Sequence, residues 1–420
     1  MRHRFLKGAL ALPALVLVLV ATPKARAADP APAPAPATTP ADSLRKALGE
    51  LRLGVGIVSD QIILFPLYAP GAPTAVPARA GVYGAGLVFT ETEPKLGGQT
   101  VHVLNGGTGP ALVVAGTVIE GGRRDRMVRY DRLVPAGEAI EIEVMPASMT
   151  RDTRAQGKDF RIADFLAPSY LRESGQFSPD TSVIPRFVSH FLDFRNPSDT
   201  RQSLIAVGES DALADSCLAC QRSFAQWPLK AGAGAAVGAI LVVRGRVQSM
   251  EVFATNEQLT DFVGPLLKSL AFPAAAIALR AKRLGIPMPW MDDPDGTLAT
   301  SSASAAALLT SLGAATYTRR KTDPTFEGEA FVVHLAEGAR GTAIVRTGRL
   351  VHAVVYPGDP FEESLYAKPL TPLDADDLSG ATNGDEGRIE LERRAASGAR
   401  LTVAELRLLA RMRERVPGVR

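Results

Sequence analysis

Apolar and polar positions alternate most clearly over residues 139–144, where Ile140, Ile142 and Val144 are separated by Glu141 and Glu143. A period of two is typical of a strand with one buried face. Short apolar runs separated by glycine and proline continue this pattern at residues 62–67, 86–93, 101–105 and 111–115. The pattern predicts a largely antiparallel β region with short connections.

Helical spacing marks two other stretches. Leu44, Leu48 and Leu51 recur at intervals of a helical turn behind polar residues that can cap a helix, and residues 257–270 read as an amphipathic helix despite Gly264 and Pro265. Residues 236–253 predict a hairpin that turns at Arg244-Gly245. A similar strand–turn–strand pattern, with its turn at Gly348-Arg349, follows about 100 residues later. Two similar hairpins do not define a repeat protein.

These elements together predict an α+β fold. We expect a mainly antiparallel β domain with peripheral helices at residues 43–275, an Ala/Ser/Pro-rich helical linker at 276–316, and a smaller C-terminal α+β unit at 317–420. The remaining roughly 380 residues are more than one hydrophobic core usually serves, which favours two folded units.

The first 42 residues have a different character. Basic Arg2, Arg4 and Lys7 precede an apolar stretch, and the small residues around Ala27 fit a cleavage site, so residues 1–27 predict a secretory signal peptide. The alternative is a retained anchor, but the apolar run is shorter than the roughly 18–20 residues that span a bilayer. Residues 28–42 alternate Pro and Ala and predict a semi-rigid linker. We expect a secreted or periplasmic protein, cleaved after Ala27, with no integral membrane segment.

The overall charge does not favour nucleic acid as a partner. The formal net charge of the whole chain is +3, but residues 1–27 carry five basic side chains and no acidic ones. Removing them leaves about −2, so the basicity belongs mostly to the targeting segment.

Cys217 and Cys220 are the two cysteines of the chain. In an exported protein such a C-x-x-C pair favours a local structural disulfide, with thiol–disulfide chemistry and a metal site as alternatives. Gln221 follows Cys220, where haem attachment would need histidine. The histidines are scattered singly, so we predict no metal site, and with no Walker, H-E-x-x-H or G-x-S-x-G pattern in the chain we expect no cofactor.

The stretch from Glu120 to Arg132 holds eight charged side chains in thirteen positions. The glycine pair at 121–122 allows a sharp turn, and guanidinium groups bind carboxylate or phosphate through paired hydrogen bonds. The candidate ligand-binding residues are Glu120, Arg123, Arg124, Asp125 and Arg126. Composition alone favours the alternative, a solvent-exposed hairpin end whose charges neutralise one another.

The same stretch carries a family resemblance. Residues 112–128 read Leu-Val-Val-Ala-Gly-Thr-Val-Ile-Glu-Gly-Gly-Arg-Arg-Asp-Arg-Met-Val, and residues 133–137 read Leu-Val-Pro-Ala-Gly. This resembles the ARPP-1 family, the ARG and rhodanese-phosphatase-superfamily-associated protein domain, a domain of unknown function. Further matches at 234–253 and 262–270 extend the resemblance over roughly residues 50–275.

The chain departs from the family pattern at two points. Arg124 stands where the family has Gln, and residues 145–151 lack the Cys, Glu and Trp of the corresponding family segment. The family name reflects gene association with ADP-ribosyl-glycohydrolase and rhodanese-phosphatase proteins, which implies only a loose link to ADP-ribose or NAD metabolism.

Two functions are compatible with these observations. The first is a periplasmic binding or scaffolding module, in which Arg123, Arg124 and Arg126 meet a small anionic ligand or a protein partner. The second is an enzyme acting on a phosphorylated or ADP-ribose-like ligand, with Glu120 or Asp125 as the acid/base. We favour the first because the sequence contains no recognisable nucleophile or metal-ligand set.

Overall fold

The computed structural model describes residues 39–59, 61–70, 86–91, 99–149, 160–178, 201–211, 235–284, 294–322 and 328–358, with single positions at 183, 184, 187, 188, 213, 222, 224 and 326. The chain divides into residues 1–38 and 39–420, and every described residue belongs to the second unit. The expected signal peptide, most of the Pro/Ala-rich linker, and Cys217 and Cys220 lie outside the described residues.

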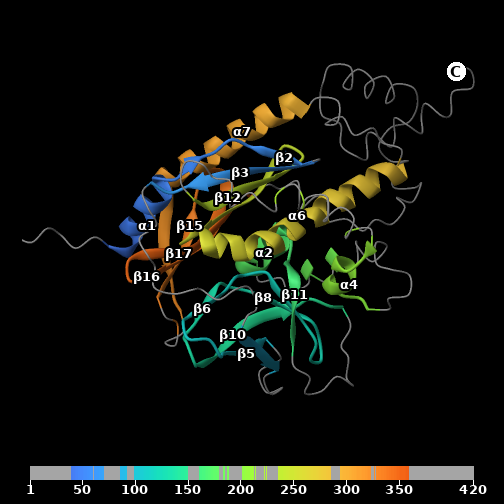
Figure 1. Ribbon diagram of the computed structural model, residues 1–420, viewed down its shortest axis with the longest axis vertical. Helices are drawn as coiled ribbons and strands as arrows, with labels where there is room; N and C mark the ends of the chain where they lie inside the picture. The colour runs from blue at the N-terminus through green and yellow to red at the C-terminus, as the bar shows by residue number, and fades with distance from the viewer. Residues whose placement is uncertain are drawn as a thin grey trace, which may run out of the picture. The chain divides into compact units, whose positions relative to one another are not determined.

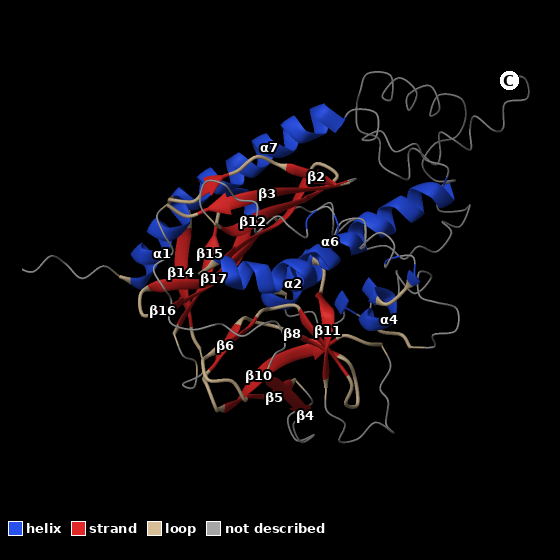
Figure 2. Ribbon diagram, viewed as in Figure 1, coloured by secondary structure: helices blue, strands red, loops and turns tan. Residues whose placement is uncertain are grey.

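The larger layer of the described residues is a nine-stranded antiparallel sheet, here called the large sheet (Figures 1 and 2). Its strand order is β1-β3-β12-β13-β17-β16-β15-β14, with β2 paired to β3. The strands are β1 (Arg52–Leu53), β2 (Ile57–Ser59), β3 (Ile62–Tyr68), β12 (Ala236–Val243), β13 (Arg246–Phe253), β14 (Thr316–Arg320), β15 (Glu329–His334), β16 (Arg340–Arg346) and β17 (Arg349–Tyr356).

Helices cover both faces of the large sheet (Figure 1). On one face, α1 (Pro40–Gly49) and α7 (Pro294–Ser311), followed by the short 3-10 turn η4 (Leu312–Ala314), bury Leu44 and Leu308 against Ile63 and Phe65. On the other face, α6 (Asn256–Leu284) packs Phe262 against the sheet. Burial on both sides explains why the central strands are apolar throughout and do not alternate.

A second β layer is inserted between β3 and β12. Its six strands are ordered β11-β7-β8-β10-β5-β4, and a separate pair joins β6 to β9. We call these strands the small sheets. They are β4 (Leu87–Glu91), β5 (Thr100–Asn105), β6 (Ala111–Val113), β7 (Thr117–Glu120), β8 (Arg126–Val128), β9 (Arg132–Val134), β10 (Ala139–Pro146) and β11 (Arg161–Leu166), with α2 (Ser169–Phe177) and α4 (Leu204–Gly208) following.

Two hairpins at the centre of the large sheet repeat the same geometry. The β12–β13 hairpin turns at Arg244 and Gly245, with φ of 53° and 75°, and the β16–β17 hairpin turns at Thr347 and Gly348, with φ of 50° and 73°. Two consecutive left-handed residues make the tight turn that matches strand twist. A Cβ on Gly238 would lie 2.2 Å from a carbonyl oxygen of the facing strand, and one on Gly341 would lie 2.1 Å from the corresponding oxygen. The two similar sequence patterns therefore correspond to two hairpins of the same sheet.

The predicted fold class is confirmed, because the described residues are rich in antiparallel strands with helices packed around them. The predicted strand at 139–144 is part of β10, with alternating burial, and the helix at 257–270 is part of α6, which continues through Pro265 and Pro273. The sequence suggested a linker at residues 276–316 between two folded units. In the structure, strands from before and after this segment lie in the same sheet, because β13 hydrogen-bonds to β17. Strands β14 to β17 thus complete the large sheet.

Candidate functional site

The predicted ligand-binding loop is the turn between β7 and β8. Gly121 and Gly122 both have positive φ, at 119° and 58°, and a Cβ on Gly122 would lie 2.7 Å from the Phe160 ring. The Gly121 N–H donates to Asp125 Oδ1 at 3.0 Å. Glycine is therefore required here both by the turn and by the close approach of Phe160.

The arginines of this loop point to different partners. The Arg123 N–H donates to both carboxylate oxygens of Glu91 at 3.3 Å, and the Arg126 guanidinium lies 3.7 Å from the same carboxylate. Arg124 instead donates from Nη2 to the Met149 carbonyl at 2.9 Å. Glu91, at the end of β4, thus contacts both Arg123 and Arg126, a role that sequence reasoning missed.

The two acidic residues of the loop also have internal partners. Burial raises the pKa of Asp125, although hydrogen bonds from Gly121 and Ser203 oppose the shift. Glu120 accepts from Arg161 Nε at 2.8 Å and from Arg201 Nη1 at 2.7 Å. Glu209 accepts from the same two arginines at 2.8 Å and 2.7 Å, which closes a four-membered ion-pair ring. The predicted ligand-binding role of the loop remains a prediction.

A second group of charges lies buried between the large and small sheets. Arg172 on α2 donates to Glu251 on β13 from both terminal nitrogens, at 2.5 Å and 3.2 Å, and from Nε to the Ala115 carbonyl at 2.9 Å. His352 on β17 contacts Asp131 and Glu251. Side-chain exposure across these four residues is 0–3 %. We call Arg172, Glu251, His352 and Asp131 the buried network.

The geometry fixes the charge on His352. Its Nδ1 lies 2.8 Å from Asp131 Oδ2 and its Nε2 lies 3.3 Å from Glu251 Oε2, so both nitrogens face carboxylate oxygens. Ionised carboxylates only accept hydrogen bonds, and both nitrogens must therefore donate. Burial by itself would lower the pKa of His352, but the Asp131 charge and the hydrogen bonds to both acids outweigh it and raise the pKa to about 9.

The acids of the buried network respond in the opposite direction. Burial by itself would raise their pKa values, but Arg172 lowers the pKa of Glu251 and His352 lowers that of Asp131. Two cations then balance two carboxylates. The carboxylates contact opposite nitrogens of one ring and do not converge on a common point, and no metal-type cluster of three His, Cys, Asp or Glu side chains occurs among the described residues. The group is arranged to hold the two layers together.

The Arg172 side chain packs directly against the backbone of Gly116. Gly116 has a φ of 89°, and a Cβ there would lie 2.4 Å from the Arg172 side chain. The neighbouring Ala115 N–H donates to Asp131 Oδ1 at 2.7 Å. The segment before β7 therefore contacts both a cation and an anion of the buried network.

A pocket of about 440 Å³ lies where β14 of the large sheet meets β5, β9 and β10 of the small sheets. We call it the cation pocket. Its lining residues are Thr100, Tyr130, Arg132, Glu141, Glu143, Arg320 and Lys321. The lining contains three cationic side chains and two glutamates, so the pocket carries charges of both signs.

Two arginines of the cation pocket are crowded together. Burial lowers the pKa of Arg320, and the positive charge of Arg132 lowers it further, while Tyr130, Asp131 and Glu143 oppose the shift. The Arg320 guanidinium lies 3.9 Å from the centre of the Tyr130 ring, and its Nη1 is buried without a hydrogen-bond partner among the described residues. Tyr130 and Arg132 belong to the charged stretch recognised in the sequence, but Arg320, at the end of β14, and Lys321, directly after it, come almost 190 residues later. The run Arg319-Arg320-Lys321 was the available signal.

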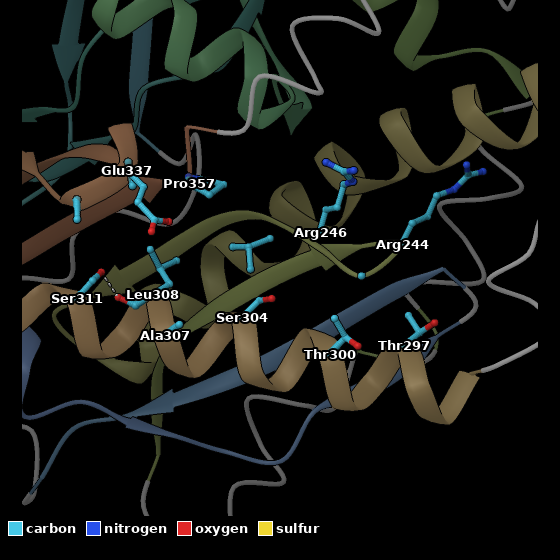
Figure 3. Close-up of a pocket in the computed structure, with 14 residues that line it drawn as sticks. Arg244, Arg246, Thr297, Thr300, Ser304, Ala307, Leu308, Ser311, Glu337 and Pro357 are labelled. Carbon is cyan, nitrogen blue, oxygen red and sulfur yellow. Dashed lines mark hydrogen bonds between the residues drawn. The ribbon is translucent and has the colours of Figure 1, made fainter. Parts of the chain in front are cut away.

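A larger groove of about 880 Å³ runs along α7 on the helical face of the large sheet. We call it the α7 groove. Figure 3 shows Arg244 and Arg246 on the side of Thr297 and Thr300, with Glu337 on the side of Leu308.

Among the described residues, no helix combines the length and the apolar character that crossing a bilayer requires.

A scan against protein families matches residues 50–356, more than half of the 420-residue chain, to the ARG and Rhodanese-Phosphatase-superfamily-associated Protein domain. The match extends beyond the roughly 50–275 expected from sequence motifs and includes all strands from β1 to β17. Searches of the curated proteins and of the solved structures found no match. The chain therefore belongs to the ARPP-1 family.

Proposed function

We propose that the protein is an exported binding module that holds a small anionic ligand in the cation pocket. The observation that carries this proposal is the buried Nη1 of Arg320, which has no hydrogen-bond acceptor among the residues that the structure describes and lies near a second arginine, Arg132. The positive charges of Arg132 and Arg320 repel each other. A carboxylate or phosphate between them removes that repulsion and supplies the missing acceptor.

The position and size of the pocket support a small ligand. The volume of about 440 Å³ falls within the usual range of roughly 300–1,000 Å³ for small-molecule sites, which favour junctions between layers. Glu141 and Glu143, which also line the pocket, suit hydroxyl or amino groups of the same ligand. The ligand class is thus a polar molecule with one anionic group.

Arg320→Gln tests the site, and Arg319→Gln is the matched control. Arg319 is the adjacent position of β14, has 69 % of its side chain exposed, and lies 3.7 Å from Glu329 outside the pocket. Inorganic phosphate and ADP-ribose serve as probes in a calorimetric titration. Losing one charged hydrogen-bond donor costs about 1.5–3 kcal/mol, so Arg320→Gln should weaken binding roughly 10- to 100-fold while Arg319→Gln leaves it unchanged. Equal affinities for the two variants would refute the assignment.

The predicted loop site is the alternative location for the same ligand. Arg124 is its test residue, because Arg123 and Arg126 contact the Glu91 carboxylate, whereas Arg124 donates to the neutral Met149 carbonyl at an exposed position. If Arg124→Gln abolishes phosphate binding and Arg320→Gln does not, the ligand belongs to the β7–β8 turn. The enzymatic alternative, with Glu120 or Asp125 as acid/base on a phosphorylated or ADP-ribose-like ligand, requires turnover of the bound probe that Asp125→Asn removes.

Export is the second part of the proposal and rests on the basic and apolar residues of positions 1–27. Expression of the full chain in a bacterial host, followed by fractionation and N-terminal sequencing, should find a periplasmic form beginning at Ala28. A cytosolic protein that retains Met1 would contradict it.

A further inference from the structure

Asp131 belongs to the buried network and also lies between two lining residues of the cation pocket. Tyr130 and Arg132 line the pocket, whereas the Asp131 side chain is 3 % exposed and contacts the network. Its Oδ1 accepts from the Ala115 N–H at 2.7 Å, and its Oδ2 lies 2.8 Å from His352 Nδ1. One short segment, residues 130–132, therefore joins the pocket to the network.

The charge of Asp131 acts on the cation pocket. Burial lowers the pKa of Arg320, the arginine on which the proposed site depends, and the negative charge of Asp131 opposes this shift. Charges that are shielded from solvent are screened by salt much less than exposed charges. A change in the net charge around Asp131 should therefore alter how strongly the pocket attracts an anion.

His352 can change that net charge. Asp131 and Glu251 contact its two ring nitrogens, Arg172 binds Glu251, and the Tyr356 ring lies 5.9 Å from the Arg172 guanidinium. Burial by itself lowers the pKa of His352, but the two carboxylates raise it to about 9. Despite burial, the charge of Glu251 raises the pKa of Arg172, and burial raises that of Tyr356 well above 10. Among these groups, His352 is therefore the one that changes charge between about pH 7 and 9.5.

We propose that the Asp131–His352 pair controls the anion affinity of the cation pocket, an inference that rests on the function proposed above. While His352 is protonated, the pair is neutral and the three cations of the pocket attract the ligand. When His352 releases its proton to solvent, the buried network has one negative charge without a balancing cation. That charge lies beside Tyr130 and Arg132 and repels a bound anion.

The coupling acts in both directions. An anion that binds more tightly when His352 is protonated must also make His352 hold its proton to a higher pH. Saturating sulfate should therefore move the His352 titration in NMR spectra to higher pH. A bound anion would in this way preserve the charged form of the network, and with it the docking of the two layers, under alkaline conditions.

Calorimetric titrations with sulfate at constant ionic strength test the coupling, because sulfate stays dianionic across this pH range and phosphate does not. The affinity of the wild type should be level to about pH 8 and fall about two- to four-fold by pH 9.5. His352→Gln leaves Asp131 without a balancing cation at every pH. It should bind sulfate about five-fold or more weakly at pH 7, with a flat profile. Circular dichroism at each pH confirms that the protein is folded.

Two further variants separate charge from structure. Asp131→Asn/His352→Gln removes both charges of the pair, and the new amide can still accept from the Ala115 N–H. This double variant should recover the wild-type affinity at pH 7 and keep a flat profile. Arg161→Gln is the matched control: it changes the net charge by the same unit as His352→Gln, on β11, which β7 and β8 separate from β10. It should leave both the affinity and the pH profile unchanged.

The results distinguish this inference from the proposed function. Sulfate binding that depends on Arg320 but has a flat wild-type profile would overturn the coupling and leave the binding site in place. A fall in affinity that persists in His352→Gln would assign it to the pocket cations and also overturn the coupling. The same holds for a double variant as weak as His352→Gln, or for an equal loss in Arg161→Gln. A wild type that binds neither sulfate nor phosphate at any pH would remove the proposed function itself.

Discussion

The residues that the structure describes include two four-membered groups of alternating charge, one buried and one partly exposed to water. The buried network joins Arg172 and His352 to Glu251 and Asp131, with side-chain exposures of 0–3 %. The ring in water, here called the exposed ring, joins Arg161 and Arg201 to Glu120 and Glu209, with exposures of 24–65 %. Each group is neutral, and the two differ mainly in their surroundings.

That difference determines what the charges do for the fold. Two unit charges 4 Å apart attract by about 1 kcal/mol in water and about 4 kcal/mol at an effective dielectric constant of 20. Desolvation cancels much of the gain for a buried group, so burial mainly raises the cost of losing one member. The buried network therefore specifies how α2 and the small sheets dock on β13 and β17, whereas the exposed ring contributes little to specificity.

Glu251→Gln should give the largest effect. The amide keeps the size of the side chain but leaves the buried Arg172 and His352 with one carboxylate between them. Breaking a buried ion pair costs roughly 3–5 kcal/mol, which should appear as a loss of unfolding free energy in urea titrations. A change below about 1 kcal/mol, the range of the exposed ring, would erase the contrast between the two groups.

The double variant Arg172→Met/Glu251→Leu tests whether the loss of stability comes from an uncompensated charge or from a change of side-chain shape. Replacing both partners with apolar residues removes the uncompensated charge and keeps most of the volume, so stability should recover by several kcal/mol relative to Glu251→Gln. Failure to recover would show that the hydrogen bonds to Ala115 and Ser249, and not charge balance, stabilise this region.

The buried network also predicts a loss of stability at alkaline pH. The folded pKa of His352 is about 9, above its ordinary value of 6.5. Its contribution is therefore complete below pH 6.5 and is lost as the pH rises through 9. At about 1.4 kcal/mol per pKa unit, this loss is on the order of 3 kcal/mol.

Urea titrations between pH 6 and 9.5 measure this loss. The unfolding free energy of the wild type should fall across the range, while that of His352→Gln should start lower and change little. Asp131 and Glu251 act on the acidic side: their lowered pKa values stabilise the fold above pH 4.5, and this contribution is lost as the pH falls through those values. A wild-type protein with a flat profile up to pH 9.5 would mean that His352 is neutral.

The sequence predicted the local geometry of turns and strands, but it did not predict the members of the buried network or of the exposed ring. The turns at Gly245 and Gly348 were recognisable because two-residue hairpins need left-handed residues, and the alternation of β10 followed from its half-buried face. Loop residues Glu120 and Arg123 attracted attention because their charges are adjacent in sequence. Their partners Glu91 and Arg161 lie 32 and 41 residues away, and only the fold brings them together.

The buried network could not be predicted from the sequence for the same reason: its members are far apart along the chain. Arg172 and Glu251 are 79 residues apart, and Asp131 and His352 are 221 apart. A signal did exist, because Glu251 and His352 each lie in a strand that is buried along most of its length. A charge in such a strand requires a buried partner, but the sequence does not identify which one. The cation pocket has the same origin, since Arg132 and Arg320 come from different sheets.

The smallest effect is expected in the exposed ring. Glu120→Gln removes one carboxylate, but Arg161 and Arg201 keep Glu209 and gain access to water. Exposed ion pairs typically contribute about 0.2–1 kcal/mol, so the unfolding free energy should fall by less than about 1 kcal/mol, and by less still in 0.5 M salt. The same salt should barely change the cost of Glu251→Gln, because ions do not reach a network with 0–3 % exposure. Equal salt sensitivity of the two variants would show that water reaches both groups and that burial does not distinguish them.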